Sequence, residues 1–334
     1  MKKLAIIYTG QPRLLPELLP YHEFLAKVLK KEMHLVGIDD IDIDLHYCLW
    51  DYNTVPSQAS KTYYEKNFIN RNETANQILS YYKESEIVCN STVQFYSYDL
   101  LESITDEFYE LCKQNDIKVH HDTLLREFAS GVSQLLIRKI AVDNMTDNYD
   151  AVLFSRTDSI IKLRGNAVDS MAFRKISRNI ISVLNHRNKP IEQIKIFNKN
   201  VKVFEDYVFV SEFYASIMSR GMTHDHQIIS STRGFKEMFS DFKSKLFNYL
   251  LKEIKVFYEL YTRYGEGASY NVILSQVFNP HRLFVLWFFD RVENIDIKDG
   301  MTLLTLKTSN ELRQEFRLIR NRDELESNPI PKEY

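Results

Sequence analysis

The chain has 334 residues, of which 44% are hydrophobic and 26% are charged, and its net charge is −2. These values are ordinary for a soluble globular protein of one large domain or two smaller ones. Glycine occurs only 9 times, which excludes a glycine-rich phosphate loop, so a phosphate site must use side chains, helix ends or a metal ion. No apolar run approaches the ~20 residues that cross a membrane, and we expect no membrane span.

The cysteines are three in number and widely spaced, at Cys48, Cys89 and Cys112. An odd number with no zinc-like spacing indicates reduced, buried thiols rather than a disulfide framework. We therefore expect a cytoplasmic protein, or one of the host cytoplasm if the chain is viral.

The first half of the chain alternates between predicted strands and helices. An apolar run over residues 3–9 predicts a strand buried on both faces, which ends at Gly10. The remaining patterns in this half predict a helix over 14–31, strands over 41–50 and 92–97, and an irregular loop or lid with helical pieces over 53–75.

The second half opens with the strongest helical pattern. Leucine and phenylalanine recur at helical spacing from residue 122 to 147, and an apolar strand follows over 149–155. Further patterns predict a helix over 236–262 and strands over 180–184, 207–211, 283–289 and 302–307.

Alternating strands and helices predict an α/β fold, Rossmann-like, with a mainly parallel sheet flanked by helices. We expect a core over residues 1–235 and a mostly helical C-terminal extension with late strands over 236–334. Ligands bind at the carboxyl ends of the strands in such sheets. That rule selects the loops at 10–13, 50–53 and 156–158.

The sharpest motif is Ser155-Arg156-Thr157-Asp158, directly after a predicted buried strand. Residues two apart on a strand point to the same side, so Arg156 and Asp158 are expected to share one site. A carboxylate suits Mg²⁺ or Mn²⁺, and a guanidinium suits a phosphate. The alternative is an internal ion pair that caps the strand, and the chemistry of the residues leaves both interpretations open.

Four motifs occur in an order that resembles a bacterial and viral group of GT-A-type glycosyltransferases. They are Ala5-Ile6-Ile7-Tyr8-Thr9-Gly10-Gln11-Pro12-Arg13, Asp42-Ile43-Asp44-Leu45-His46 leading to Trp50-Asp51, Gln134 within a long helix, and Tyr149 to Asp158. The last motif presents an "R-x-D" in place of the usual DXD. The resemblance covers roughly residues 3–230.

The resemblance implies a GT-A-like fold and a nucleoside-diphosphate sugar as donor substrate. Asp158 would hold a Mn²⁺ or Mg²⁺ ion that bridges the diphosphate. The residues that would border the nucleotide and its phosphates are Thr9, Gly10, Gln11, Arg13, Gln134, Arg138 and Arg156.

Three later residues complete the implied site. Asp206 is the candidate general base on an acceptor hydroxyl, and Glu266 resembles an acceptor-side carboxylate. His224, in Thr223-His224-Asp225-His226, is a second candidate metal ligand. The alternative for each of these residues is a turn or loop position with no catalytic or metal-binding role.

Basic residues concentrate in one segment, residues 162–202, which carries a net charge of +8 while the rest of the chain carries −10. Such a segment often faces phosphates, although it can also be a solvated insertion. We therefore expect an acceptor that is either double-stranded DNA with hydroxymethylated bases, as in bacteriophages, or a capsule or lipopolysaccharide glycan. A non-catalytic nucleotide- or polyanion-binding module is the remaining hypothesis.

Overall fold

The computed structural model describes residues 1–57, 60–145, 149–161, 227–263, 270–278 and 322–330, together with short pieces of the intervening chain. Those pieces are the helical residues 180–181, 183–184 and 283, and the short strands 194–196, 199–201, 208–210, 213–214, 222–223 and 316–318. The predicted strands at 284–289 and 302–307 lie outside the described residues.

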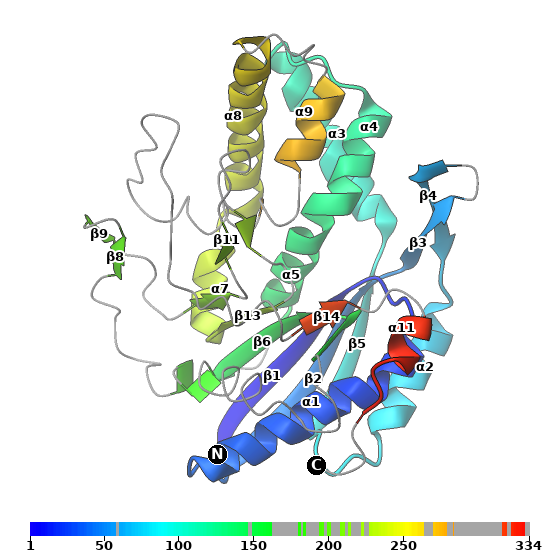
Figure 1. The fold of residues 1–334 in the computed structure, drawn as a ribbon, viewed down its shortest axis with the longest axis vertical. Coiled ribbons are helices and arrows are strands. Elements are labelled where there is room, and N and C mark those ends of the chain that lie inside the picture. The colour runs from blue at the N-terminus through cyan, green and yellow to red at the C-terminus, as the bar shows by residue number, and fades with distance from the viewer. Residues whose placement is uncertain are drawn as a thin grey trace.

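A sheet of six strands, in the order β10-β13-β6-β1-β2-β5, forms the centre of the molecule (Figure 1). The strands β6, β1, β2 and β5 run parallel, whereas β13 runs antiparallel to both of its neighbours, β6 and β10. The expected α/β fold with a mainly parallel, helix-flanked sheet is confirmed. The strands are β1 (Lys2–Gly10), β2 (Ile41–Trp50), β5 (Asn90–Tyr96), β6 (Ala151–Arg156), β10 (Val208–Val210) and β13 (Gln227–Ser230).

Helices cover both faces of this sheet (Figure 1). One face packs on α1 (Leu15–Leu35) and α2 (Arg71–Tyr82), and the other packs on the remaining long helices. These are α3 (Tyr98–Gln114), α4 (His121–Glu127), α5 (Ser133–Asp143), α7 (Thr232–Met238), α8 (Phe242–Arg263) and α9 (Tyr270–Val277).

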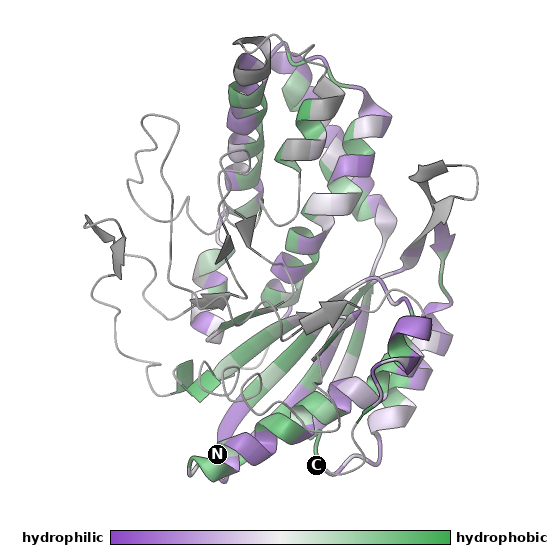
Figure 2. Cartoon of the chain, viewed as in Figure 1, coloured by the Kyte–Doolittle hydropathy of each residue, from purple (hydrophilic) through white to green (hydrophobic). Residues whose placement is uncertain are grey.

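Alternation along β1 explains the two layers. Leu4, Ile6 and Tyr8 pack toward α1, whereas Ala5 and Ile7 pack toward α5, because successive side chains of a strand point to opposite faces. The apolar run that predicted a doubly buried strand therefore buries side chains on both faces of the sheet. Figure 2 shows the hydrophobic colouring of the central strands and the mixed colouring of α1 and α8, which are amphipathic.

Several expected elements differ in the structure. The first part of residues 53–75 is a hairpin of β3 (Tyr52–Ser57) and β4 (Ser60–Phe68) rather than an irregular loop, and the start of α2 supplies the expected helical piece. Residues 180–181 and 183–184 are helical, so the strand predicted over 180–184 is wrong, and Leu283 is helical too. Short apolar runs suit a buried helix as well as a strand.

The long helix expected over 122–147 is present with a change of winding. The π-helical turn Phe128–Val132 separates α4 from α5, which ends at Asp143. The helix expected over 236–262 is divided between α7 and α8, and Asp241 between them has φ 50°. Helix α3 was not expected at all.

The cysteines form no disulfide, and Cys48 and Cys112 are buried as expected, but Cys89 is exposed. Among the described residues, no helix is long and apolar enough to cross a membrane.

Gly131, in the π-helical turn, lies directly against the end of α9. A Cβ atom on Gly131 would be 1.9 Å from the Phe278 carbonyl oxygen and 3.0 Å from the Leu283 side chain. A backbone oxygen cannot turn aside as a flexible side chain does, so this contact needs a residue without a side chain.

We predict that Gly131→Ala lowers the free energy of unfolding by about 3 kcal/mol, at the upper end for overpacked cores. Urea denaturation measures the loss. Ser130→Ala, in the same turn, is the control, and it should change stability by no more than about 0.5 kcal/mol. Equal effects of the two substitutions would contradict the close packing of α9 on this turn.

Candidate functional site at the carboxyl ends of the strands

Three parallel strands end together at one edge of the sheet. Thr9 in β1 is paired with Cys48 in β2 and with Arg156 in β6. Residues 10–13, 50–53 and 156–158 therefore follow strands that end side by side, as the sequence predicted.

The turn after β6 is bonded to the end of β1. The Thr157 backbone N–H donates to the Thr9 carbonyl oxygen at 3.2 Å, and the Thr157 hydroxyl donates to the Gln11 carbonyl oxygen at 2.8 Å. Gly10, between them, has φ +135°, and a Cβ there would be 3.2 Å from Thr157 Oγ1. Glycine meets both demands because it has no side chain and tolerates positive φ.

Arg156 and Asp158 meet in the way the motif predicted. The guanidinium donates two hydrogen bonds of 2.8 Å, from Nε to one carboxylate oxygen and from an Nη to the other. The two side chains are 18% and 10% exposed. The pair is thus a bidentate ion pair at the rim of the site. That geometry suits an oriented phosphate-binding guanidinium, and it equally suits a pair that caps the strand.

The helix α5 places two further predicted residues beside β1. Arg138 is fully buried, and its Nε lies 3.4 Å from the Thr9 hydroxyl oxygen. Gln134 Nε2 lies 4.0 Å from the position of a Cβ on Gly10. Arg138 therefore reaches the strand end through Thr9, below the surface that a ligand would touch.

Arg13 lies on the outer side of the same loop. It is half-buried, and its Nε donates to Gln11 Oε1 at 3.0 Å. Burial raises the pKa of the Tyr52 phenol, and neighbouring Gln11 and Arg13 act in the opposite direction. The loops after β1 and β2 are thus neighbours at this edge.

Asp51, at the end of β2, has a structural task. Its carboxylate accepts a hydrogen bond from the Tyr98 backbone N–H at 3.1 Å, at the first turn of α3, and forms an ion pair with Arg71. A buried carboxylate at a helix N-terminus satisfies N–H groups that lack a partner within the helix. Asp51 therefore holds α2 and α3 to the strand end.

His22 is a residue near the site that the sequence did not reveal. It lies in α1, fully buried, with its ring stacked on Tyr8 at 3.7 Å and its Nδ1 3.0 Å from the Tyr47 hydroxyl oxygen. Burial lowers the pKa of His22 to about 3, although the Thr157 backbone and the Asp158 carboxylate act to raise it. His22 is thus a neutral imidazole in the core, close to the Arg156–Asp158 turn.

The other predicted site residues lie outside the described part of the chain. These are Asp206, His224 and Glu266, and most of the basic segment 162–202 lies outside it as well.

The residues that are described do not make a divalent-cation site by themselves. Within the described parts of the chain, no three His, Cys, Asp or Glu side chains gather closely enough to hold a metal ion. Asp158, the expected ligand, gives both oxygens to Arg156. A cation there would have to share or displace that guanidinium, so a metal does not fit this arrangement as it stands.

No protein-family model and no curated protein matches the chain. Among solved structures, it is similar to the apo form of mouse xyloside xylosyltransferase 1, with 11% sequence identity and a TM-score of 0.33. The similarity covers 85% of this chain and 81% of that one. A likeness of this extent establishes no function.

The neutral, buried His22 predicts a pH dependence of stability. Its folded pKa of about 3 lies below the ordinary 6.5, so only the unfolded chain takes up this proton at mildly acid pH. The contribution of His22 to the free energy of unfolding is therefore complete well above pH 6.5, and it is lost as the pH drops toward 3. Between pH 7 and pH 5 the loss from His22 is about 2 kcal/mol.

Urea denaturation at both pH values tests this, with His22→Gln and with His34→Gln, an exposed histidine of the same helix. We expect His22→Gln to remove the loss that belongs to His22 and His34→Gln to keep it. An equal change in the free energy of unfolding between the two pH values in wild type and His22→Gln would show that the imidazole is not held neutral.

Proposed function

We propose that the chain is a glycosyltransferase that moves a sugar from a nucleoside-diphosphate sugar to a hydroxyl acceptor. The observation that supports it most is the position of the bonded Gly10 and Thr157 loops. They lie between β1 and β6, where the strand order reverses: β1 continues to β2 and β5 on one side, and β6 lies on the other. Ligands of open α/β sheets bind at such a switch point.

The charged groups at this point fit a diphosphate. Arg13 and Arg156 are both partly accessible there, and guanidinium groups bind phosphate oxygens in a bidentate manner. Asp158 holds Arg156 in one orientation. Pre-oriented cations stabilise the negative charge that develops on a leaving nucleoside diphosphate.

The transfer itself breaks the bond between the anomeric carbon and the diphosphate oxygen and forms a bond to the acceptor oxygen. The acceptor hydroxyl must lose its proton to a base, for which Asp206 is the candidate, with Glu266 on the acceptor side. The divalent cation expected at Asp158 and His224 enters no step of this transfer, because both Asp158 oxygens are bonded to Arg156. The proposal leaves the acceptor open between a glycan and hydroxymethylated DNA.

A second candidate function follows from the bidentate Arg156–Asp158 pair. If that pair only caps β6, the chain is a binding module without catalysis. The two proposals differ in what the pair does when a nucleotide is added.

The donor proposal predicts that nucleotide sugars stabilise the chain. A UDP- or GDP-sugar at 100 times its dissociation constant should add ~2.7 kcal/mol to the free energy of unfolding. Arg13→Gln should weaken the binding about tenfold or more, because hydrogen bonds to charged groups contribute about 1.5–3 kcal/mol. The control is Arg126→Gln, a surface arginine paired with Glu127.

Titrations with Mn²⁺ and with EDTA test the cation in the same assay. No stabilisation by any nucleotide sugar under either condition would contradict the donor proposal.

The Arg156–Asp158 pair is tested by a double-mutant cycle of Arg156→Ala and Asp158→Ala. The donor proposal predicts that each single variant and the double variant lose nucleotide binding. The capping alternative predicts a stability coupling of about 0.5–3 kcal/mol, with nucleotide binding unchanged or never present. Denaturation and nucleotide titration of the four proteins distinguish the two.

A further inference from the structure

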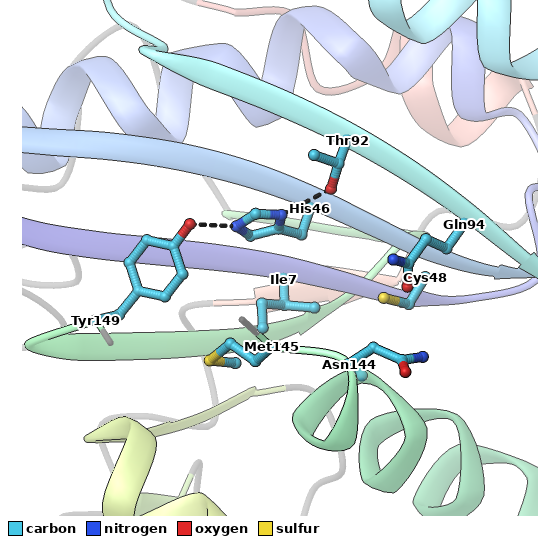
Figure 3. Close-up of a pocket in the computed structure, with 9 residues that line it drawn as sticks. Ile7, His46, Cys48, Thr92, Gln94, Asn144, Met145 and Tyr149 are labelled. Carbon is cyan, nitrogen blue, oxygen red and sulfur yellow. Dashed lines mark hydrogen bonds between the residues drawn. The ribbon is translucent and has the colours of Figure 1, made fainter. Parts of the chain in front are cut away.

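An open cavity of about 180 Å³ lies on the face of the sheet that α5 covers, away from the strand ends, with the exposed Thr92, Gln94 and Asn144 among its lining residues. It is bordered by β2, β5 and the last turn of α5 (Figure 3). At ~30 Å³ per water molecule, this space equals about six waters, or one small ring with its substituents. None of its lining residues belongs to the proposed donor site.

One wall of the cavity is a chain of hydrogen bonds with a fixed direction (Figure 3). Tyr149 donates its hydroxyl proton to Asp44 Oδ2 at 2.8 Å. Its oxygen must then accept from His46 Nε2, 2.8 Å away. In the neutral imidazole, His46 Nδ1 then accepts from the Thr92 hydroxyl at 2.7 Å. Thr92 has given away its proton and presents oxygen lone pairs, so this wall accepts hydrogen bonds.

A second directed chain carries two amides, from Gln94, two residues after Thr92 in β5, and from Asn144 at the end of α5 (Figure 3). Asn144 Nδ2 donates to the Tyr96 hydroxyl at 2.9 Å, and that hydroxyl donates to Gln94 Oε1 at 2.6 Å. These bonds use the Gln94 carbonyl oxygen and one Asn144 N–H. The Gln94 amide N–H groups and the Asn144 carbonyl oxygen remain, within the described part of the chain, to donate to and accept from a ligand.

The rest of the lining is uncharged. Ile7, Ala141 and Met145 give an apolar surface, and burial raises the pKa of the neighbouring Cys48 thiol to about 12, so it stays protonated. No Asp, Glu, Lys or Arg side chain lines the cavity among the described residues. The lining therefore offers no counter-charge to a charged ligand.

We propose that this cavity binds an uncharged, hydroxyl-bearing molecule about one ring in size, of the class of monosaccharides and cyclic polyols. Hydroxyl groups can donate to the Thr92 and Asn144 oxygens and accept from the Gln94 N–H groups. The carbon side of such a ring suits the apolar surface. The site goes beyond the proposed function, because it needs neither a nucleotide nor the strand-end residues.

Calorimetric titration of the full chain tests the site, with D-glucose, D-xylose, N-acetyl-D-glucosamine and myo-inositol as separate probes and no nucleotide present. We expect saturable binding of at least one probe at millimolar concentration. The double variant Gln94→Ala/Asn144→Ala should weaken it about tenfold, because two hydrogen bonds are lost. The matched control is Gln77→Ala/Asn76→Ala, which removes the same residue types from the exposed surface of α2.

Thr92 separates a binding role from a structural one. Thr92→Ser keeps the hydroxyl and should retain binding, whereas Thr92→Val should lose it while the circular dichroism of the folded chain is unchanged. Absence of saturable binding by all four probes would overturn the proposal. So would binding that Gln94→Ala/Asn144→Ala leaves at the wild-type affinity.

The outcome is distinguishable from that of the donor proposal. Asp158→Ala should retain sugar binding in this cavity even where it abolishes nucleotide binding. Loss of sugar binding in Asp158→Ala would show that the two sites are one.

Discussion

The parallel pairing of β1 between β2 and β6 is the constraint on which the rest of the structure depends. Thr9 lies opposite Cys48 on one side and Arg156 on the other, so three loops that are distant in sequence begin at one edge. A slip of one residue would turn every side chain of β1 to the opposite face. Both buried faces of β1 resist such a slip, because Tyr8 packs on α1 and Ile7 packs toward α5.

Polar side chains in the core lie next to the residues at which the paired strands end. His22 packs below Thr157 on one face, and Arg138 reaches Thr9 on the other. The turn that carries the Arg156–Asp158 pair therefore lies close to polar core side chains on both faces of the sheet. The two bonds to Asp158 support the Arg156 guanidinium, restrict its motion and lower the entropy lost when it binds a ligand. The same support would also stabilise a purely structural pair, which is why nucleotide binding has to separate the two.

The sequence predicted the central strands well, because doubly buried strands read as unbroken apolar runs. It therefore also predicted the edge at which Gly10 and Asp158 meet. It failed where the pattern is short or mixed: the apolar run at 180–184 suits a helix as well as a strand. Helix α3 carries signals of its own, because Ser97 caps it and Leu101, Phe108 and Cys112 form its buried face. The polar residues between them obscured the helical spacing of these apolar positions.

The roles of His22, Asp51 and Arg138 were beyond sequence reasoning for a different reason. Each is a polar residue whose burial depends on partners far along the chain, such as Tyr47, Tyr98 and Thr9. Periodicity predicts which face of an element carries a side chain, but it does not predict which distant residue that side chain will contact. Gln94 and Asn144 likewise meet only through Tyr96.

Turnover of nucleotide sugars is the most direct test of a donor site at the ends of β1 and β6. A panel of UDP- and GDP-sugars is incubated with the wild-type chain, Arg13→Gln and Asp158→Asn, and the products are separated. A donor site here predicts that the wild type releases free nucleoside diphosphate and that each variant loses about 100-fold or more of this activity. Release of pyrophosphate instead would indicate nucleotidyl transfer. No turnover of any donor, or equal turnover in all three proteins, would contradict a donor site at the ends of β1 and β6.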